Sequence, residues 1–160
     1  MESKVVGLIL DTSVLVTAER RGKSISQILT QLHASHGEVE AGLSVVTIAE
    51  LTHGIERAAL KEQRQRRQAF VDELIEDLPI HPVTTEVARL AGTLSGQRAG
   101  RGITLPFEDL LIGATALHLG FAVVTENIRH FEIIPGAMHS ATLTVGLRDS
   151  YFVSLSVRTK

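Results

Sequence analysis

The chain has 160 residues, which suits one domain, and 44% of them are hydrophobic while only 4% are aromatic. It contains no cysteine, which excludes disulfides and thiolate metal sites. The formal net charge of −2 does not by itself indicate nucleic acid binding. Because aromatic residues are so few, the core must be aliphatic, a composition that suits helices packed on a buried sheet.

The first half of the chain alternates between predicted strands and helices. An apolar run predicts a buried strand that ends at Asp11, and the residues after it continue into a helix. Apolar residues at helical spacing predict a second helix over about 24–33. A strand over 43–46 precedes Thr47, which forms a capping-box sequence with Glu50 and places Glu50 in the first turn of a third helix. The N-terminal apolar run is too short to span a membrane, so we expect a cytoplasmic protein.

Prolines and glycines divide the middle of the chain. After a long helix through 70–75, the apolar stretch 78–83 contains prolines, which predicts an edge strand or an extended connection because proline cannot donate a backbone hydrogen bond. Thr84 or Thr85 is expected to cap the next helix. The stretch 96–102 is rich in glycine and predicts a flexible loop.

The last third of the chain repeats this alternation before it becomes less regular. Pro106 suits the first turn of a helix that Gly120 ends, and residues 121–125 form another buried apolar run. The stretch 142–157 alternates only weakly, so one or two strands, a partner-binding arm and a poorly ordered tail all remain open. Strands that alternate with helices predict an α/β fold in which helices flank a mainly parallel sheet.

Acidic residues occur where such a sheet forms its sites, at the carboxyl ends of the strands. Asp11 ends the first strand, Glu50 follows the second, and Asp109 lies in the first turn of the helix that Pro106 begins. Residues 125–127 directly follow the last of these strands. Each acid taken singly suits a helix cap or a favourable interaction with a helix dipole. Together, beside buried segments, the acids indicate one shared site.

Carboxylates that lie together near a hydrophobic core repel one another and lose solvation. A divalent cation removes that cost, and an all-oxygen set of ligands favours Mg²⁺ or Mn²⁺. Such an ion lowers the pKa of a bound water and stabilises charge on a phosphate under attack. Ser13 or Thr12 is expected to position a water or a phosphate oxygen there. The sequence therefore predicts a metal site suited to phosphate chemistry.

Four segments in a fixed order carry a resemblance to a known family. They are 10–15 (LDTSVL), 44–54 (SVVTIAELTHG), 106–116 (PFEDLLIGATA) and 124–131 (VTENIRHF). The chain resembles a PIN-domain ribonuclease, specifically a VapC-like toxin of a type II toxin–antitoxin pair. The resemblance implies a three-layer PIN-like α/β fold over residues 1–139 and leaves 140–160 as a C-terminal extension without an assigned structure.

For the site, the resemblance implies that Asp11, Glu50 and Asp109 hold Mg²⁺ or Mn²⁺ and that Asn127 fills the fourth catalytic position. An amide adds no charge, so we expect one well-formed metal position and a second only when RNA supplies phosphate ligands. Glu108 is expected to point outward, because neighbouring helix residues point about 100° apart. The residues expected to support the ligands are Thr12, Ser13 and Thr125.

The resemblance also implies partners. These are an RNA substrate, a VapB-like antitoxin that inserts a segment into the active-site groove, and a second copy of the chain in a homodimer. The implied activity is metal-dependent hydrolysis of RNA phosphodiester bonds, and the alternative is a PIN-like module that binds RNA or protein without nuclease activity. The cationic residues expected to hold the RNA backbone are Arg64, Arg67, Arg98 and Arg101. Without an acidic site nearby, the arginines around Arg64 would instead be read as a solvated helix face.

Overall fold

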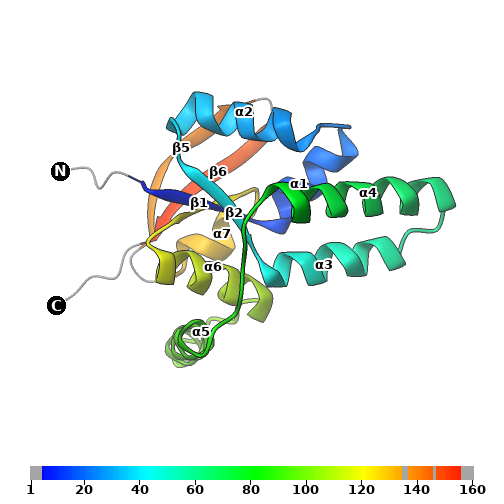
Figure 1. Cartoon of the computed structure of the whole chain (residues 1–160). Coiled ribbons are helices and arrows are strands. Elements are labelled where there is room, and N and C mark those ends of the chain that lie inside the picture. Colours follow the sequence, from blue (N-terminus) through cyan, green and yellow to red (C-terminus); the bar gives the residue numbers. More distant parts are fainter. Residues whose placement is uncertain (1–4, 135–136, 146, 156–160) are drawn as a thin grey trace.

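The computed structural model of the chain describes residues 5–134, 137–145 and 147–155, with side chains up to residue 134. A six-stranded sheet runs through the molecule in the order β3-β2-β1-β4-β6-β5 (Figure 1). Its strands are β1 Gly7–Leu10, β2 Glu40–Ser44, β3 Ile80–His81, β4 Ala122–Thr125, β5 Ala137–Val145 and β6 Leu147–Leu155. The pairs among β1 to β4 are parallel, whereas β5 and β6 are antiparallel to each other and β6 is antiparallel to β4.

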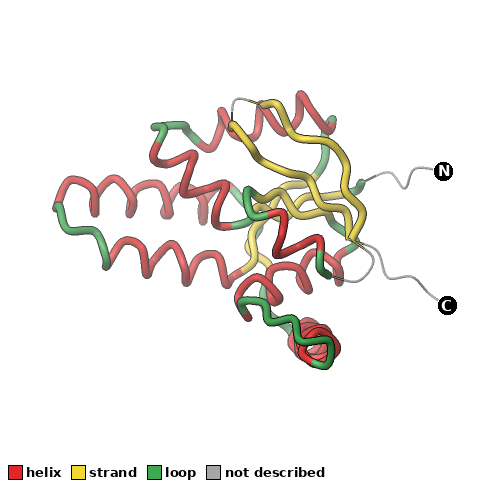
Figure 2. Tube along the Cα trace, turned by 180° about the vertical axis from the view of Figure 1, so that it is seen from behind, coloured by secondary structure: helices red, strands yellow, loops and turns green. Residues whose placement is uncertain are grey.

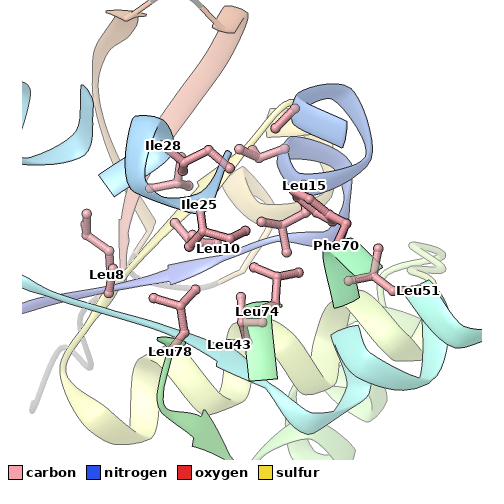
Figure 3. Packing of buried hydrophobic residues seen from close by; sticks show 14 of the residues in the cluster. Leu8, Leu10, Leu15, Ile25, Ile28, Leu43, Leu51, Phe70, Leu74 and Leu78 are labelled. Atoms are coloured by element: carbon pink, nitrogen blue, oxygen red, sulfur yellow. The ribbon is translucent and has the colours of Figure 1, made fainter. Parts of the chain in front are cut away.

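Helices cover both faces of this sheet. In the described residues they are α1 Thr12–Arg20, α2 Ile25–His36, α3 Val45–Glu56, α4 Lys61–Asp77, α5 Thr85–Ala99, α6 Phe107–Leu119 and α7 Ile128–Glu132. Leu8 and Leu10 of β1 join a buried cluster with residues of α1 to α4, part of which Figure 3 shows. Ile9 points the other way, into a second cluster with α5 to α7. The predicted three-layer α/β fold is confirmed, and Figure 2 shows its strands between the two groups of helices.

The second strand and its helix begin earlier than predicted. β2 ends at Ser44 and α3 begins at Val45, so the second half of the strand predicted over 43–46 is wrong. The Ser44 hydroxyl accepts a hydrogen bond from the Val46 amide and caps α3. The capping box at Thr47 is therefore wrong as well. The β-branched pair Val45-Val46 suggests a strand, but the cap that precedes it starts a helix.

Two helices are longer than predicted. α2 continues to His36, beyond the predicted end at 33, and α5 continues through Gly96 to Ala99. The flexible loop predicted over 96–102 is therefore wrong for most of its length. A glycine inside a helix costs only about 1 kcal/mol relative to alanine, and buried residues such as Leu94 hold α5 in the core. Thr84 is confirmed as the cap of α5, because its hydroxyl accepts from the Val87 amide at 3.2 Å.

The two edges of the sheet are formed by β3 and β5. β3 is a two-residue strand at the edge of the sheet, which confirms the edge strand predicted from the prolines. The stretch left open after residue 142 contributes to β5 and β6, and β6 pairs with β4 from Ala122↔Ser154 to Thr125↔Tyr151. β4 is thus flanked on both sides. None of the helices in the described part of the chain is long and apolar enough to cross a bilayer.

Candidate active site

Asp11 stands at the carboxyl end of β1, in the middle of the sheet. Its amide donates to the Val124 carbonyl of β4 at 2.9 Å, so the strand pairing continues up to this residue. Asp11 is only 2% exposed. It occupies the N-cap position of α1, yet its side chain makes no capping hydrogen bond. The carboxylate is therefore not used to cap the helix.

Two hydroxyl groups hold the Asp11 carboxylate. Ser13 Oγ donates to Asp11 Oδ2 at 2.7 Å, and Thr125 Oγ1 donates to the same oxygen at 2.8 Å. Each hydroxyl also accepts a backbone amide, from Glu126 to Ser13 at 3.0 Å and from Asn127 to Thr125 at 2.8 Å. A hydroxyl has one proton, so accepting from an amide and donating to a carboxylate fixes its orientation. Both hydroxyls thus bind Oδ2 of Asp11, which leaves its Oδ1 for a ligand.

Glu50 lies in the second turn of α3, not in the first turn as predicted, because the helix begins at Val45. Burial is the main cause that raises the pKa of Glu50, and the charges of Asp11 and Asp109 raise it further. A hydrogen bond from Thr12 opposes the shift. Glu50 Oε1 is buried and has no hydrogen-bond partner among the described residues. Its anionic form thus lacks part of the stabilisation that a bound cation would supply.

Asp109 lies in the first turn of α6, as predicted. Burial raises the pKa of Asp109 and the charge of Asp11 adds to this, while a hydrogen bond with His130 acts in the opposite direction. His130 Nδ1 of α7 lies 2.5 Å from Asp109 Oδ2. The sequence did not select His130, whose side chain is 40% exposed. The only signal was its place in the fourth family-like segment.

The predicted catalytic residues meet in one pocket of about 350 Å³. Asp11, Glu50, Asp109 and Asn127 all line it, although they come from four different elements. A neighbouring hollow of about 580 Å³ shares Glu50 and Asp109 and extends the pocket along α3 and the start of α6. Exposed Glu108 lines this second hollow, which agrees with its predicted outward direction.

Glu126 is an acid of this pocket that the sequence did not select. Its Oε2 accepts from Thr17 Oγ1 at 2.6 Å, and its Oε1 is buried without a hydrogen-bond partner in the described part of the chain. Asn127, selected in its place, is exposed and makes no side-chain capping bond at the start of α7. Both residues follow β4 directly, so sequence position alone did not distinguish them.

The donors of the pocket fit Mg²⁺ or Mn²⁺, because they are carboxylate and amide oxygens and two of the buried carboxylate oxygens have no hydrogen-bond partner within the described part of the chain. Across residues 5–134, no three acidic or histidine side chains lie close enough together to enclose one ion. Mg²⁺ usually keeps several waters and takes only one or two protein carboxylates. An open pocket with Asp11 and Asp109 in reach suits that mode of binding.

Comparison with known proteins shows the family to which this chain belongs. Residues 8–136 match the PIN-domain family. The chain belongs to that family. It is 30% identical to Ribonuclease VapC1 of Rickettsia felis over 90% of this chain and 100% of that protein. It is 33% identical to the tRNA(fMet)-specific endonuclease VapC of Salmonella typhimurium over 59% of this chain and 69% of that protein. The crystal structure of DNA-bound VapBC from Salmonella typhimurium superimposes with a TM-score of 0.68 at 26% identity, covering 82% of this chain and 95% of that one. The chain is thus a VapC-like PIN domain.

The basic residues of this PIN domain are distributed unevenly around the pocket. Arg67 donates to the Gly54 carbonyl at 2.6 Å and lines a hollow of about 160 Å³ that also contains Glu50 and Arg20. Exposed Arg64 makes an ion pair with Glu56 at 3.5 Å. Arg20, which the sequence did not select, lines the acidic pocket itself.

The other two selected arginines lie at the end of α5. Arg98 is in the last turn of this helix, and exposed Arg101 follows in the turn after it. Neither lines the acidic pocket or the hollows beside it. Their contact with RNA remains a prediction that depends on a substrate long enough to reach α5.

Glu50→Gln is expected to stabilise this PIN domain in EDTA. Folding raises the pKa of this carboxyl, so the unfolded chain releases the proton more readily than the folded chain. The free energy of unfolding therefore falls as the pH rises through the folded pKa. An amide has no such charge. Near pH 8 the Tm should rise by about 2–4 °C, the shift that about 1 kcal/mol produces in a domain of this size. Thermal melts from pH 4 to pH 8 measure it, and the gain should shrink toward pH 4.

The exposed loop residue Glu38 supplies the matched control, since Glu38→Gln should leave the Tm unchanged at every pH. Addition of Mn²⁺ should reverse the order, because the wild-type protein binds the ion better and is stabilised by mass action. A Glu50→Gln protein that melts no higher than wild type in EDTA would show that the pocket carries no repulsion for a cation to relieve.

Proposed function

We propose that this PIN domain is a metal-dependent endoribonuclease that acts as a toxin and is neutralised by a cognate antitoxin. The observation that carries the proposal is the meeting of Asp11, Glu50 and Asp109 in one pocket, with Asp11 oriented by a dedicated network. Loss of these acids would favour the alternative, a PIN-like module that only binds RNA or protein. The chain keeps all three.

In the proposed mechanism, Asp11 and Asp109 would hold Mg²⁺ or Mn²⁺, with Glu50 reached directly or through a water and with Asn127 and Glu126 beside them. The ion would supply Lewis acidity and an activated water. Ser13 and Thr125 keep Asp11 in one orientation and favour its ionised form. Glu50 Oε1 is buried in the pocket and has no hydrogen-bond partner among the described residues, which suits it to accept a proton from a water there.

The partners follow from the relatives. Two of these are named as a ribonuclease and a tRNA(fMet)-specific endonuclease, and the solved neighbour is a VapBC complex on DNA. By this likeness we propose an RNA substrate, with tRNA as the first to test, and a VapB-like antitoxin that is met in the cytoplasm. A homodimer remains a prediction from the family.

The direct test uses the purified full chain, freed of antitoxin, with a transcribed tRNA. We expect endonucleolytic products with excess Mg²⁺ or Mn²⁺, none in EDTA, and no cleavage of single-stranded DNA of the same sequence. Re-addition of antitoxin should stop the reaction. Cleavage that continues in EDTA would contradict the proposal, and so would binding of RNA without any cleavage in either metal, which is the result expected of a binding module.

Charge reversal near the pocket should weaken RNA binding through lost phosphate contacts. We expect Arg20→Glu and Arg67→Glu to lower affinity about 10-fold near 0.1 M salt and to reduce the slope of log K against log salt by about one each. Arg64→Glu should do less, because Glu56 already neutralises that side chain. Fluorescence anisotropy measures both the affinity and the salt slope. Every protein in this series also carries Asp11→Asn, so that the RNA is not cleaved.

Arg101→Glu is the matched control for a short RNA, because Arg101 lies outside the pocket and its hollows. Circular dichroism must show that Arg67→Glu still folds, since its side chain also bonds the Gly54 carbonyl. Salt slopes that stay the same in the Arg20 and Arg67 variants would show that RNA enters by another route.

A further inference from the structure

The contact between His130 and Asp109 is a feature that the family assignment does not explain. We propose that His130 is a positioning residue, which holds Asp109 in the orientation that binds the metal; the inference rests on the proposed function. The two side chains come from the first turn of α6 and from α7, and their polar atoms meet at 2.5 Å.

The ionised form of Asp109, which binds a cation, determines which partner donates. An ionised carboxylate can only accept, so His130 donates from Nδ1 to Asp109 Oδ2. This contact leaves Oδ1 of Asp109 for the pocket that Asp109 lines. A carboxylate without such a donor rotates freely about its side-chain bonds, and a ligand in several orientations binds an ion less well.

Burial separates this pair from an ordinary surface ion pair. The Asp109 side chain is only 15% exposed, whereas that of His130 is 40% exposed. Pairs on the open surface contribute little because both partners are hydrated and mobile. The backbone at His130 is anchored, because the next residue, Phe131, is fully buried and the His130 amide donates to the Asn127 carbonyl.

The same short segment also orients Asp11. Thr125 donates to Asp11 Oδ2 from the end of β4, and the amides of Glu126 and Asn127 align the two hydroxyls of that network. His130 then holds the corresponding oxygen of Asp109. One stretch of chain, residues 125–130, thus fixes one oxygen of each carboxylate and leaves the other oxygen of each for a cation.

The test measures Mn²⁺ binding to the full chain without RNA, by the loss of the free-ion signal in electron paramagnetic resonance. His130→Ala should weaken Mn²⁺ binding about 10-fold or more, the usual effect of removing a group that orients a ligand. His130→Asn should recover most of the affinity, because its amide places a donor near the position of Nδ1. His130→Gln, whose amide lies one bond further out, should not.

His118→Ala is the matched control, since exposed His118 lies in the last turn of the same helix as Asp109 and outside the pocket. It should bind Mn²⁺ as wild type does. In the cleavage assay, His130→Ala should lower kcat more than it raises KM, and added Mn²⁺ should restore part of the rate. If His130→Ala fails to fold, the difference between the Asn and Gln variants decides the question.

Asp11→Asn in the same binding assay separates the two proposals. Loss of Mn²⁺ binding in Asp11→Asn together with wild-type binding in His130→Ala would overturn the positioning role and leave the nuclease proposal intact. Equal losses in the Asn, Gln and Ala variants would also overturn it, because the hydrogen bond would then not be the cause. Failure of the wild-type protein itself to bind Mn²⁺ would overturn the nuclease proposal.

Discussion

Replacement of Asp11 by Asn will reduce metal-dependent RNA cleavage by about 10²–10⁴-fold, the range found when a group that acts in the transition state is removed. The variant should nevertheless fold normally. Asn has the same shape, and its carbonyl oxygen can accept the two hydrogen bonds that Ser13 and Thr125 donate to Oδ2. Its NH₂ group then takes the place of Oδ1 and presents protons where a cation would bind.

The measurement is single-turnover cleavage of a tRNA at fixed Mn²⁺, with thermal melting to confirm the fold. Asp77→Asn is the matched control, because exposed Asp77 ends α4 and lies outside the pocket. It should cleave at the wild-type rate. Wild-type activity in Asp11→Asn would move the active site elsewhere and leave the acidic pocket without a catalytic role.

Replacement of Phe131 by Ala will lower the free energy of unfolding by about 3–5 kcal/mol, the cost of removing a buried aromatic side chain. Phe131 is 0% exposed and belongs to the core cluster between the sheet and α5 to α7. Gly113 of α6 faces it closely, since a Cβ there would lie 3.6 Å from Phe131 Cδ1 and 2.5 Å from Ile134 Cδ1. α7 is therefore packed directly on α6, and the alanine would leave a cavity between them.

Urea denaturation at 25 °C gives this free energy. Phe107→Ala supplies the matched control, because Phe107 is 50% exposed at the start of α6 and should cost less than about 1 kcal/mol. Since α7 also carries His130, a folded Phe131→Ala protein should bind Mn²⁺ more weakly than wild type. Similar losses of stability for both phenylalanines would show that α7 is not anchored through Phe131.

The sequence was most informative for residues whose positions are set by their neighbours along the chain. Asp11 follows an apolar run whose side chains are covered on both faces, and such a strand is legible because nearly every position is hydrophobic. Asp109 follows Pro106, and proline is common where a helix begins. Glu50 lines the pocket, but its predicted place in the first turn of α3 was wrong because Val45 and Val46 suit a strand as well as a helix.

Tertiary structure decided the contacts between residues far apart in the chain. Both Glu126 and Asn127 line the pocket, and the hydroxyl that binds Glu126 belongs to Thr17 of α1. The sequence after β4 does not predict this contact. The partner of His130 is set by the packing of α7 on α6, through Phe131 and Gly113. Arg66 lies in the basic stretch of α4, yet it is paired with Glu19 at 2.9 Å.

The sequence by itself thus determined that this chain is an α/β PIN domain with acids at the ends of its central strands. Periodicity and chain order report burial and strand direction, and these two properties bring Asp11 and Asp109 to one edge of the sheet. Only the tertiary structure decided which oxygen of each carboxylate is held and which is left for a cation. That depends on side chains such as Thr125 and His130. Thr125 lies 2.8 Å from the carboxylate of Asp11, more than a hundred residues earlier in the chain. His130 lies 2.5 Å from the carboxylate of Asp109 because α7 packs on α6.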